Sequence, residues 1–351
     1  MSAAVTQINS QDNQDRRVDP RILDKYKREM GPLLSKLIED PLTEDIVLNP
    51  DGRLWARRRG KKFAVVGTME DYDALMWLGT VAFMRGDKVI NAESPLLECD
   101  LPIYKSRLEA LVPPVVTSPI FAIRPRPRSV FSLDDYHSRG ILTHKDDPNN
   151  RRRQRENRLS EIAGMNHKEI LEHAVVNRWN ILVAGSTGSG KTTFCNALLE
   201  AQSRLCPDDR TLLIEDTPEL HCEVENHVPL LSSLKFTMLD CLRACMRLKP
   251  DRISVGEVRG GEALTLLKAW NTGHGGGFAT LHANDGYASL LRLESLIREA
   301  ITDVDQGDLI AEVVNLVVFI DGDPTLPNGR KVKEVCLVVG YENGRYLIEQ
   351  V

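Results

Sequence analysis

The sequence lacks any run of eighteen or more apolar residues, so no segment of it is predicted to span a membrane. The first residues, MSAAVTQINSQDNQDRR, are polar and contain no apolar core segment, which argues against a secretory signal peptide. We therefore expect the chain to stay in the cytoplasm.

Positive charge is not in excess either: 45 Lys and Arg stand against 50 Asp and Glu, which gives a net charge of −5. A dedicated nucleic-acid binder is usually basic, so nucleic acid is not expected as a direct substrate. The seven cysteines include no C-x-x-C pair, which favours free thiols over a disulfide framework. Cys241 and Cys245 lie four residues apart, and two buried small residues explain them better than a metal pair.

What the sequence does contain is a change of pattern along the chain. Residues 1–18 are polar without periodicity and predict a disordered tail. Residues 19–130 mix helical and strand patterns, including expected strands at 103–112 and 120–124, and predict a small α+β domain.

Residues 131–165 are predicted to be a linker between two domains. Within them the stretch KDDPNNRRRQRENRLSE is almost free of apolar side chains and cannot contribute to a core. A basic patch for anionic lipid or DNA is the alternative interpretation of these charges.

From 166 to 351 strand and helix patterns alternate. Strands are expected at 180–184, 211–215, 252–256 and 278–281, each followed by a helical pattern. Such alternation predicts an α/β fold with a mostly parallel sheet covered by helices.

A glycine-rich segment follows the first of these strands and opens a helix. It matches G-x-x-x-x-G-K-[ST], in which curled backbone presents N–H groups to phosphate oxygens at a helix N-terminus. Lys191 is expected to reach the β- and γ-phosphates, and the Thr192 hydroxyl to bind Mg²⁺, so ATP and Mg²⁺ are the predicted ligands. The expected nucleotide-binding residues are Gly185, Ser186, Thr187, Gly188, Ser189, Gly190, Lys191, Thr192 and Thr193.

Carboxylates stand at the ends of two predicted strands. In parallel sheets ligands bind beyond the carboxyl ends, so Glu257, after the strand RISVG, is placed on the phosphate side and predicted to orient the attacking water. Glu215 and Asp216 follow LLI in the same way and are predicted to support Mg²⁺, mainly through water. A turn-forming role is the alternative for Asp216.

Two histidines flank the strand at 278–281. His274 precedes it in a run of glycines, and His282 follows it directly. Both are predicted to contact the γ-phosphate, although a lone histidine is more often structural.

Together the segments GSTGSGKT, IEDTPE, RISVGEVRG and TGHGGGFATLHAN resemble the traffic ATPases of type II and type IV secretion. They match, in order, that family's Walker A loop, acidic box, Walker B segment and histidine box. The N-terminal sequences SRLEALVPP and IFAIRP resemble the family as well. The short N-terminal domain and the missing cysteine pairs of many type II secretion ATPases favour the conjugation and type IV secretion branch.

The resemblance implies a RecA-like P-loop core with a smaller N-terminal domain that contributes arginines to the nucleotide. Arg107 and Arg124 would then neutralise the negative charge that develops during phosphoryl transfer, and Arg247 and Arg259 are further candidates. The resemblance also implies a hexameric ring that powers secretion or pilus assembly. Its partners would be channel components at the inner face of the cytoplasmic membrane, with peripheral membrane association.

Two other functions stay open at this point. A nucleotide-gated scaffold would bind ATP with negligible turnover, which Glu257 and the two arginines argue against. A nucleic-acid motor on the same RecA-like core would bind DNA in a salt-sensitive way, which the negative net charge argues against.

Overall fold

The computed structural model describes residues 19–86, 88–127, 131–142, 157–301 and 305–351. The predicted tail at 1–18 and most of the charged stretch of the linker lie outside these residues. The chain forms two compact units, and each is described by itself. Unit 1 comprises Met1–Pro113 with Ser118–Gln154, and unit 2 comprises Pro114–Thr117 with Arg155–Val351.

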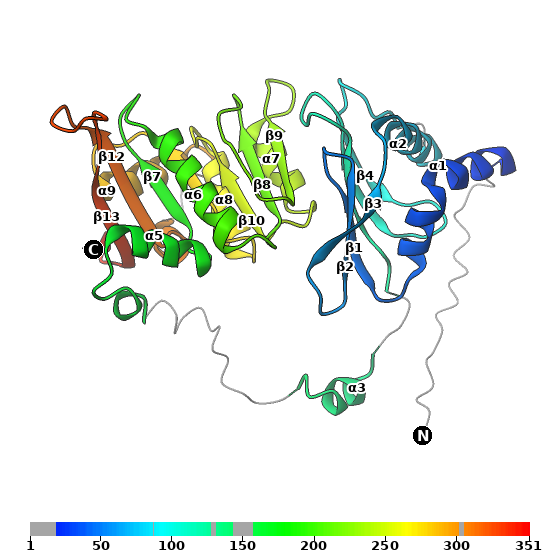
Figure 1. Cartoon of the computed structure of the whole chain (residues 1–351), viewed down its shortest axis with the longest axis horizontal. Helices are drawn as coiled ribbons and strands as arrows, with labels where there is room; N and C mark the ends of the chain where they lie inside the picture. The colour runs from blue at the N-terminus through cyan, green and yellow to red at the C-terminus, as the bar shows by residue number, and fades with distance from the viewer. Residues whose placement is uncertain (1–18, 87, 128–130, 143–156, 302–304) are drawn as a thin grey trace. The chain divides into compact units, whose positions relative to one another are not determined.

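Unit 1 is a six-stranded antiparallel sheet with two helices packed on one face (Figure 1). The strand order is β3-β2-β1-β6-β5-β4. The elements are α1 (Pro20–Glu39), β1 (Thr43–Leu48), β2 (Arg53–Arg58), β3 (Phe63–Thr68), α2 (Asp71–Met84), β4 (Leu96–Asp100), β5 (Arg107–Leu111), β6 (Ile120–Arg124) and the short α3 (Leu133–Ser138).

Aromatic side chains hold the helices of unit 1 to its sheet. Trp77 of α2 is fully buried between Tyr26 of α1 and Phe121 of β6, with ring centroids 6.3 and 5.3 Å away. Burying rings of this size is a large hydrophobic contribution to folding. A kink interrupts α1 at Gly31, whose φ of 73° favours glycine, and Pro32 follows it.

Unit 2 is an eight-stranded sheet in the order β14-β13-β12-β7-β11-β10-β8-β9. The six strands from β12 to β9 run parallel, and β13 and β14 continue the sheet antiparallel. The strands are β7 (Ile181–Ala184), β8 (Thr211–Glu215), β9 (His227–Leu231), β10 (Arg252–Val255), β11 (Phe278–Leu281), β12 (Leu316–Gly322), β13 (Arg330–Glu342) and β14 (Arg345–Gln350). The helices are α5 (His167–Val176), α6 (Lys191–Leu205), α7 (Met238–Cys245), α8 (Glu262–Asn271), α9 (Gly286–Arg298) and α10 (Gly307–Val313).

Helices cover both faces of this sheet. In Figure 1, α5 and α6 lie in front of it and α8 and α9 behind it. The short parallel strands β7, β8, β10 and β11 are buried along their whole length, as a doubly covered sheet requires. Their carboxyl ends share one edge, which is where open α/β sheets bind ligands.

The predicted α/β class with a smaller α+β domain is confirmed, but some elements differ from the sequence patterns. The strand expected at 103–112 begins only at Arg107, because Ile103 and Lys105 take positive φ in a turn before it. β4, β9 and β14 were not predicted. In the described part of the chain, no helix combines the length and apolar character that crossing a membrane needs.

Candidate functional site

The phosphate-binding segment forms a tight loop between β7 and α6. Gly188 and Gly190 have φ of 75° and 98°, a region that favours glycine. A Cβ on Gly185 would lie 2.0 Å from the carbonyl oxygen of Ile320 on β12, so only glycine fits there. The loop ends at Lys191, the first residue of α6, so its backbone meets the helix N-terminus.

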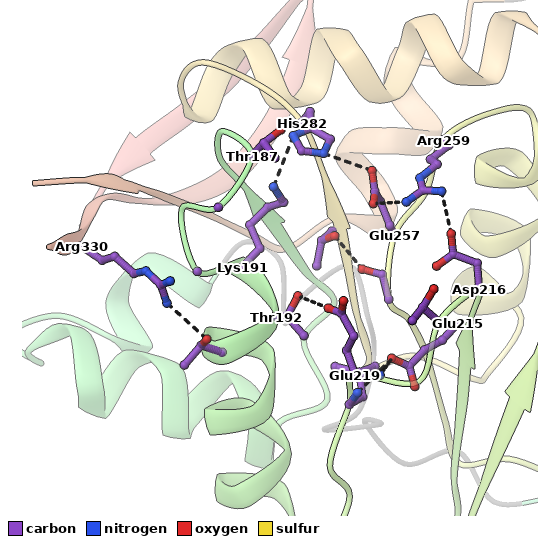
Figure 2. A pocket seen from close by; sticks show the side chains of 17 residues that line it. Thr187, Lys191, Thr192, Glu215, Asp216, Glu219, Glu257, Arg259, His282 and Arg330 are labelled. Atoms are coloured by element: carbon purple, nitrogen blue, oxygen red, sulfur yellow. Dashed lines mark hydrogen bonds and ion pairs between the residues drawn. The ribbon is translucent and has the colours of Figure 1, made fainter. Parts of the chain in front are cut away.

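A cavity of about 390 Å³ opens beside this loop. Its walls come from the loop itself, from the segments after β8 and β10, from β11 and the residue that follows it, and from the start of β13 (Figure 2). The cavity therefore lies at the edge where the carboxyl ends of the parallel strands meet. Its lining is mainly polar and charged, as a site for a phosphorylated ligand requires.

The ammonium of Lys191 is held at the mouth of the loop. Its Nζ donates to the carbonyl oxygens of Gly185 and Ser186 at 3.0 and 2.9 Å, and lies 3.3 Å from Nδ1 of His282. Partial burial lowers the pKa of Lys191, while the charge of Glu257 opposes that shift. Because an ammonium can only donate, Nδ1 of His282 is the acceptor in this contact.

Glu257 lies at the centre of a charged network. Its Oε1 is 3.2 Å from Nε2 of His282, and its Oε2 accepts from Arg259 at 2.8 Å. Arg259 also donates to Asp216 at 2.6 Å. Burial alone would raise the pKa of Glu257, but the hydrogen bond and charge of Arg259, with His282 and Lys191, hold that pKa below its usual range. Glu257 is thus ionised at neutral pH and can accept a proton from water.

A second carboxylate faces the predicted magnesium ligand. The hydroxyl of Thr192 donates to Oε2 of Glu219 at 3.0 Å (Figure 2). Glu215 accepts from the backbone N–H groups of Glu219 and Leu220 at 2.9 Å each, and burial raises its pKa despite these bonds. Glu215 therefore positions the segment that carries Glu219, in addition to its predicted support of Mg²⁺.

The donor set suits a metal that is shared with a nucleotide. Among the residues that the structure describes, no three His, Cys, Asp or Glu side chains are grouped so that they could hold a metal ion. Mg²⁺ usually binds through one or two carboxylates, several waters and substrate phosphates. The hydroxyl of Thr192 and the carboxylate of Glu219 fit that pattern, and Asp216 is engaged by Arg259.

The structure brings most of the predicted site residues together around this cavity. Lys191, Glu257 and His282 line it. Gly185 and Ser186 do not line it, but their carbonyl oxygens accept hydrogen bonds from Lys191. The predicted residues among its lining are Thr187, Gly188, Gly190, Lys191, Thr192, Thr193, Glu215, Asp216, Glu257 and His282.

His274 lies elsewhere in unit 2. It precedes β11, whereas His282 follows it, so the two are at opposite edges of the parallel sheet. Its Nδ1 donates to the carbonyl oxygen of Pro250 at 2.9 Å, and it does not line the cavity. The expectation that both histidines face one phosphate is therefore corrected, because β11 separates them.

Arg107 and Arg124 belong to unit 1. They stand directly opposite each other on β5 and β6, and both are exposed. Like charges in this position repel, which an anion bound between them would relieve. Their predicted role toward the nucleotide stays a prediction.

Two charged residues of the cavity were not singled out from the sequence. Glu219 is the last residue of the segment IEDTPE, so its membership of the acidic box could have identified it. Arg330, at the start of β13, lines the cavity from a part of the chain that carries no motif. Of the two further arginine candidates, Arg259 lies in the cavity and Arg247 does not line it.

Comparison with known proteins gives consistent likenesses. A family model described as "Type II/IV secretion system protein" matches residues 153–320. The chain is 40% identical over 333 residues to a probable conjugal transfer protein TrbB of Sinorhizobium fredii, covering 95% of this chain and 94% of that protein. A conjugal transfer protein TrbB of Rhizobium radiobacter is 39% identical, with 95% of each covered.

A solved structure is similar across both units. The VirB11 ATPase of the Brucella suis type IV secretion system, crystallised in complex with sulphate, superposes with a TM-score of 0.80 at 26% identity. The match covers 91% of this chain and 97% of that one.

Proposed function

The chain belongs to the family of type II/IV secretion ATPases, on the branch of the conjugal transfer proteins, and we propose that its cavity hydrolyses ATP to drive conjugative or type IV secretion. The family expected from the four sequence motifs is thereby confirmed. The observation that carries the proposal is the arrangement of Lys191 in the loop with the ionised Glu257 across the cavity. Lys191 would bind the triphosphate, and Glu257 would direct water at it.

In the proposed reaction the loop and α6 hold the phosphates, and Lys191 contacts the β- and γ-phosphates. A water oxygen bonds to the γ-phosphorus while the bond from that phosphorus to the β–γ bridging oxygen breaks. The carboxylate of Glu257 accepts a proton from the water, and ADP leaves with the bonding electrons. His282 holds Glu257 and Lys191 in register through its two ring nitrogens.

Thr192 and Glu219 are the side chains that would hold Mg²⁺, with Glu215 and Asp216 reaching it through water. The chemistry that the ion supplies is neutralisation of charge on the phosphate oxygens.

A hexameric ring is part of the proposal, as is work on channel components at the inner face of the cytoplasmic membrane. In such a ring Arg107 and Arg124 would supply positive charge to a nucleotide during hydrolysis. Their exposed, directly opposed placement supports this role. Light scattering with and without ATP measures the mass of the assembly, and the mass of a monomer under both conditions would contradict the ring.

Lys191→Ala tests the site itself. We expect ATP turnover to fall by about a hundredfold or more, because one preorganised charge on the transferring group is lost. Lys268→Ala, an exposed lysine on α8, is the matched control and should hydrolyse ATP as the unaltered chain does. Unchanged nucleotide affinity and turnover in Lys191→Ala would refute the site. Negligible turnover in the unaltered ring would favour the nucleotide-gated scaffold.

A further inference from the structure

Arg330 packs against the phosphate loop from the far end of the chain. Its Nη1 donates to the hydroxyl of Thr193 at 3.4 Å. A Cβ placed on Gly190 would lie 2.8 Å from Cδ of Arg330 and 3.0 Å from Nη1, so the arginine lies directly over that glycine. The absence of a side chain at Gly190 therefore makes room for Arg330 as well as for the turn.

The hairpin of β12 and β13 fixes this position. Ser186 in the loop donates to Asp321 of β12 at 2.7 Å, and Asp321 is paired with Lys333 of β13 at 3.5 Å. The carbonyl of Ile320 packs on Gly185. Since β12 is attached to the loop and β13 is paired with β12, the fold presents the guanidinium of Arg330 to the cavity.

The charge of Arg330 has no acidic partner within the described residues, since none of their carboxylates lies within 4.0 Å of it. Arg259, in the same cavity, is paired with both Glu257 and Asp216. A cation without a counter-charge, beside a loop built to bind phosphate, is suited to a bound anion.

The position of Arg330 in the cavity indicates which phosphates of the nucleotide it would contact. Figure 2 shows Arg330 across the loop from Glu257 and Arg259, which mark the end where water attacks. Thr193 follows Thr192 on α6, so its side chain points about 100° further around the helix, away from the magnesium side. Arg330 therefore faces the part of the nucleotide that is not transferred.

We propose that Arg330 is a nucleotide-binding residue, acting within one subunit, that contacts the α- and β-phosphates common to ATP and ADP. The proposal rests on the ATPase function above and adds to it a residue that controls affinity and the release of ADP. Because ATP and ADP both carry these phosphates, Arg330 binds substrate and product alike. Its contact with the α-phosphate, whose charge does not change, is uniform binding, which changes affinity and leaves the chemical step nearly unaltered. The β-phosphate gains negative charge as ADP leaves, so the contact with it is expected to change turnover slightly.

Arg330→Ala in the full chain is the direct test, with binding of ADP and of a non-hydrolysable ATP analogue measured by calorimetry in the presence of Mg²⁺. We expect both dissociation constants to rise by about ten- to a hundredfold, as loss of a charged hydrogen-bonding group predicts. Turnover at saturating ATP should stay within about threefold. Arg330→Lys should recover part of the affinity, because it keeps the charge without the planar fork.

The control is Lys331→Ala, which removes the same charge from the next, exposed position of β13, on the opposite face of the strand. It should bind both nucleotides as the unaltered chain does. Affinities of Arg330→Ala and Arg330→Lys that match this control would overturn the proposal. So would a loss confined to the ATP analogue, since Arg330 would then act on the γ-phosphate. An unaltered chain that binds no ADP would instead overturn the proposed function.

Discussion

The two edges of the sheet in unit 2 both carry arginine–carboxylate networks, but the networks differ in burial. At the carboxyl edge Arg259 joins Glu257 and Asp216, and its side chain is 64% exposed. At the amino edge Arg252 joins Asp209 at 2.7 Å and the carbonyl of Gly276 at 2.9 Å, and its side chain is 1% exposed. One strand connects them, since Arg252 begins β10 and Glu257 follows it.

The difference in burial indicates that the Arg252 network has a structural role and the Arg259 network a chemical one. Arg252 and Asp209 are buried, so their opposite charges must neutralise each other, and Arg178 is a second cation 2.6 Å from Asp209. The opposing arginines hold the pKa of Asp209 below its usual range although burial alone would raise it. The open network lines the cavity, so its side chains are accessible to a bound ligand. At the amino edge the ionised Asp209 is therefore held in place by its arginines. At the carboxyl edge the ionised Glu257 faces the cavity and is available for a reaction.

The largest expected effect is on the chemistry of the open edge. Glu257→Gln keeps the shape of the side chain but removes the proton acceptor, so turnover should fall by about a hundred- to ten-thousandfold. Nucleotide affinity and thermal stability should change little, because the amide can still accept from Arg259. Steady-state ATPase measurement checks this, and Glu200→Gln, at an exposed position of α6, is the control. Undiminished turnover would remove Glu257 from its assigned role.

Next in size is the cost of opening the closed edge. Arg252→Ala leaves Asp209 buried with one counter-charge fewer, and the free energy of unfolding should drop by about 3–5 kcal/mol. Arg259→Ala removes two ion pairs of an exposed guanidinium, with Glu257 and Asp216, and should cost about 1 kcal/mol or less. Urea unfolding of both variants measures the contrast. Equal losses of stability would show that burial does not distinguish the two networks.

The sequence was sufficient for the parts of the site that depend on local order along the chain. The loop around Lys191 follows from its motif, and Glu257 follows from its place two residues beyond a buried strand. Both rest on a rule that holds for any parallel sheet, namely that carboxyl ends share an edge. The α/β class followed from strand and helix alternation for the same reason.

The parts that depend on packing between distant segments could not be found this way. Arg330 reaches the loop only because β12 pairs with β7 and carries the hairpin with it. The short strand β9 contains Pro229 and has no clear alternation, so it gave no pattern to read. The glycines around Gly276 surround His274, which was predicted to contact the γ-phosphate, yet a Cβ on Gly276 would meet Arg178 at 2.7 Å, so close packing explains this glycine.

The smallest effect separates the two histidines that flank β11. His282→Ala should lower turnover by about tenfold, because Glu257 and Lys191 each lose a polar contact in the cavity. His274→Ala should leave turnover unchanged and lower the free energy of unfolding by about 1 kcal/mol, the worth of its bond to Pro250. ATPase rates and urea unfolding, measured on both variants, distinguish the roles. If His274→Ala instead slowed hydrolysis as much as His282→Ala at unaltered stability, the amino edge would take part in the reaction. The division of labour between the two edges would then be wrong.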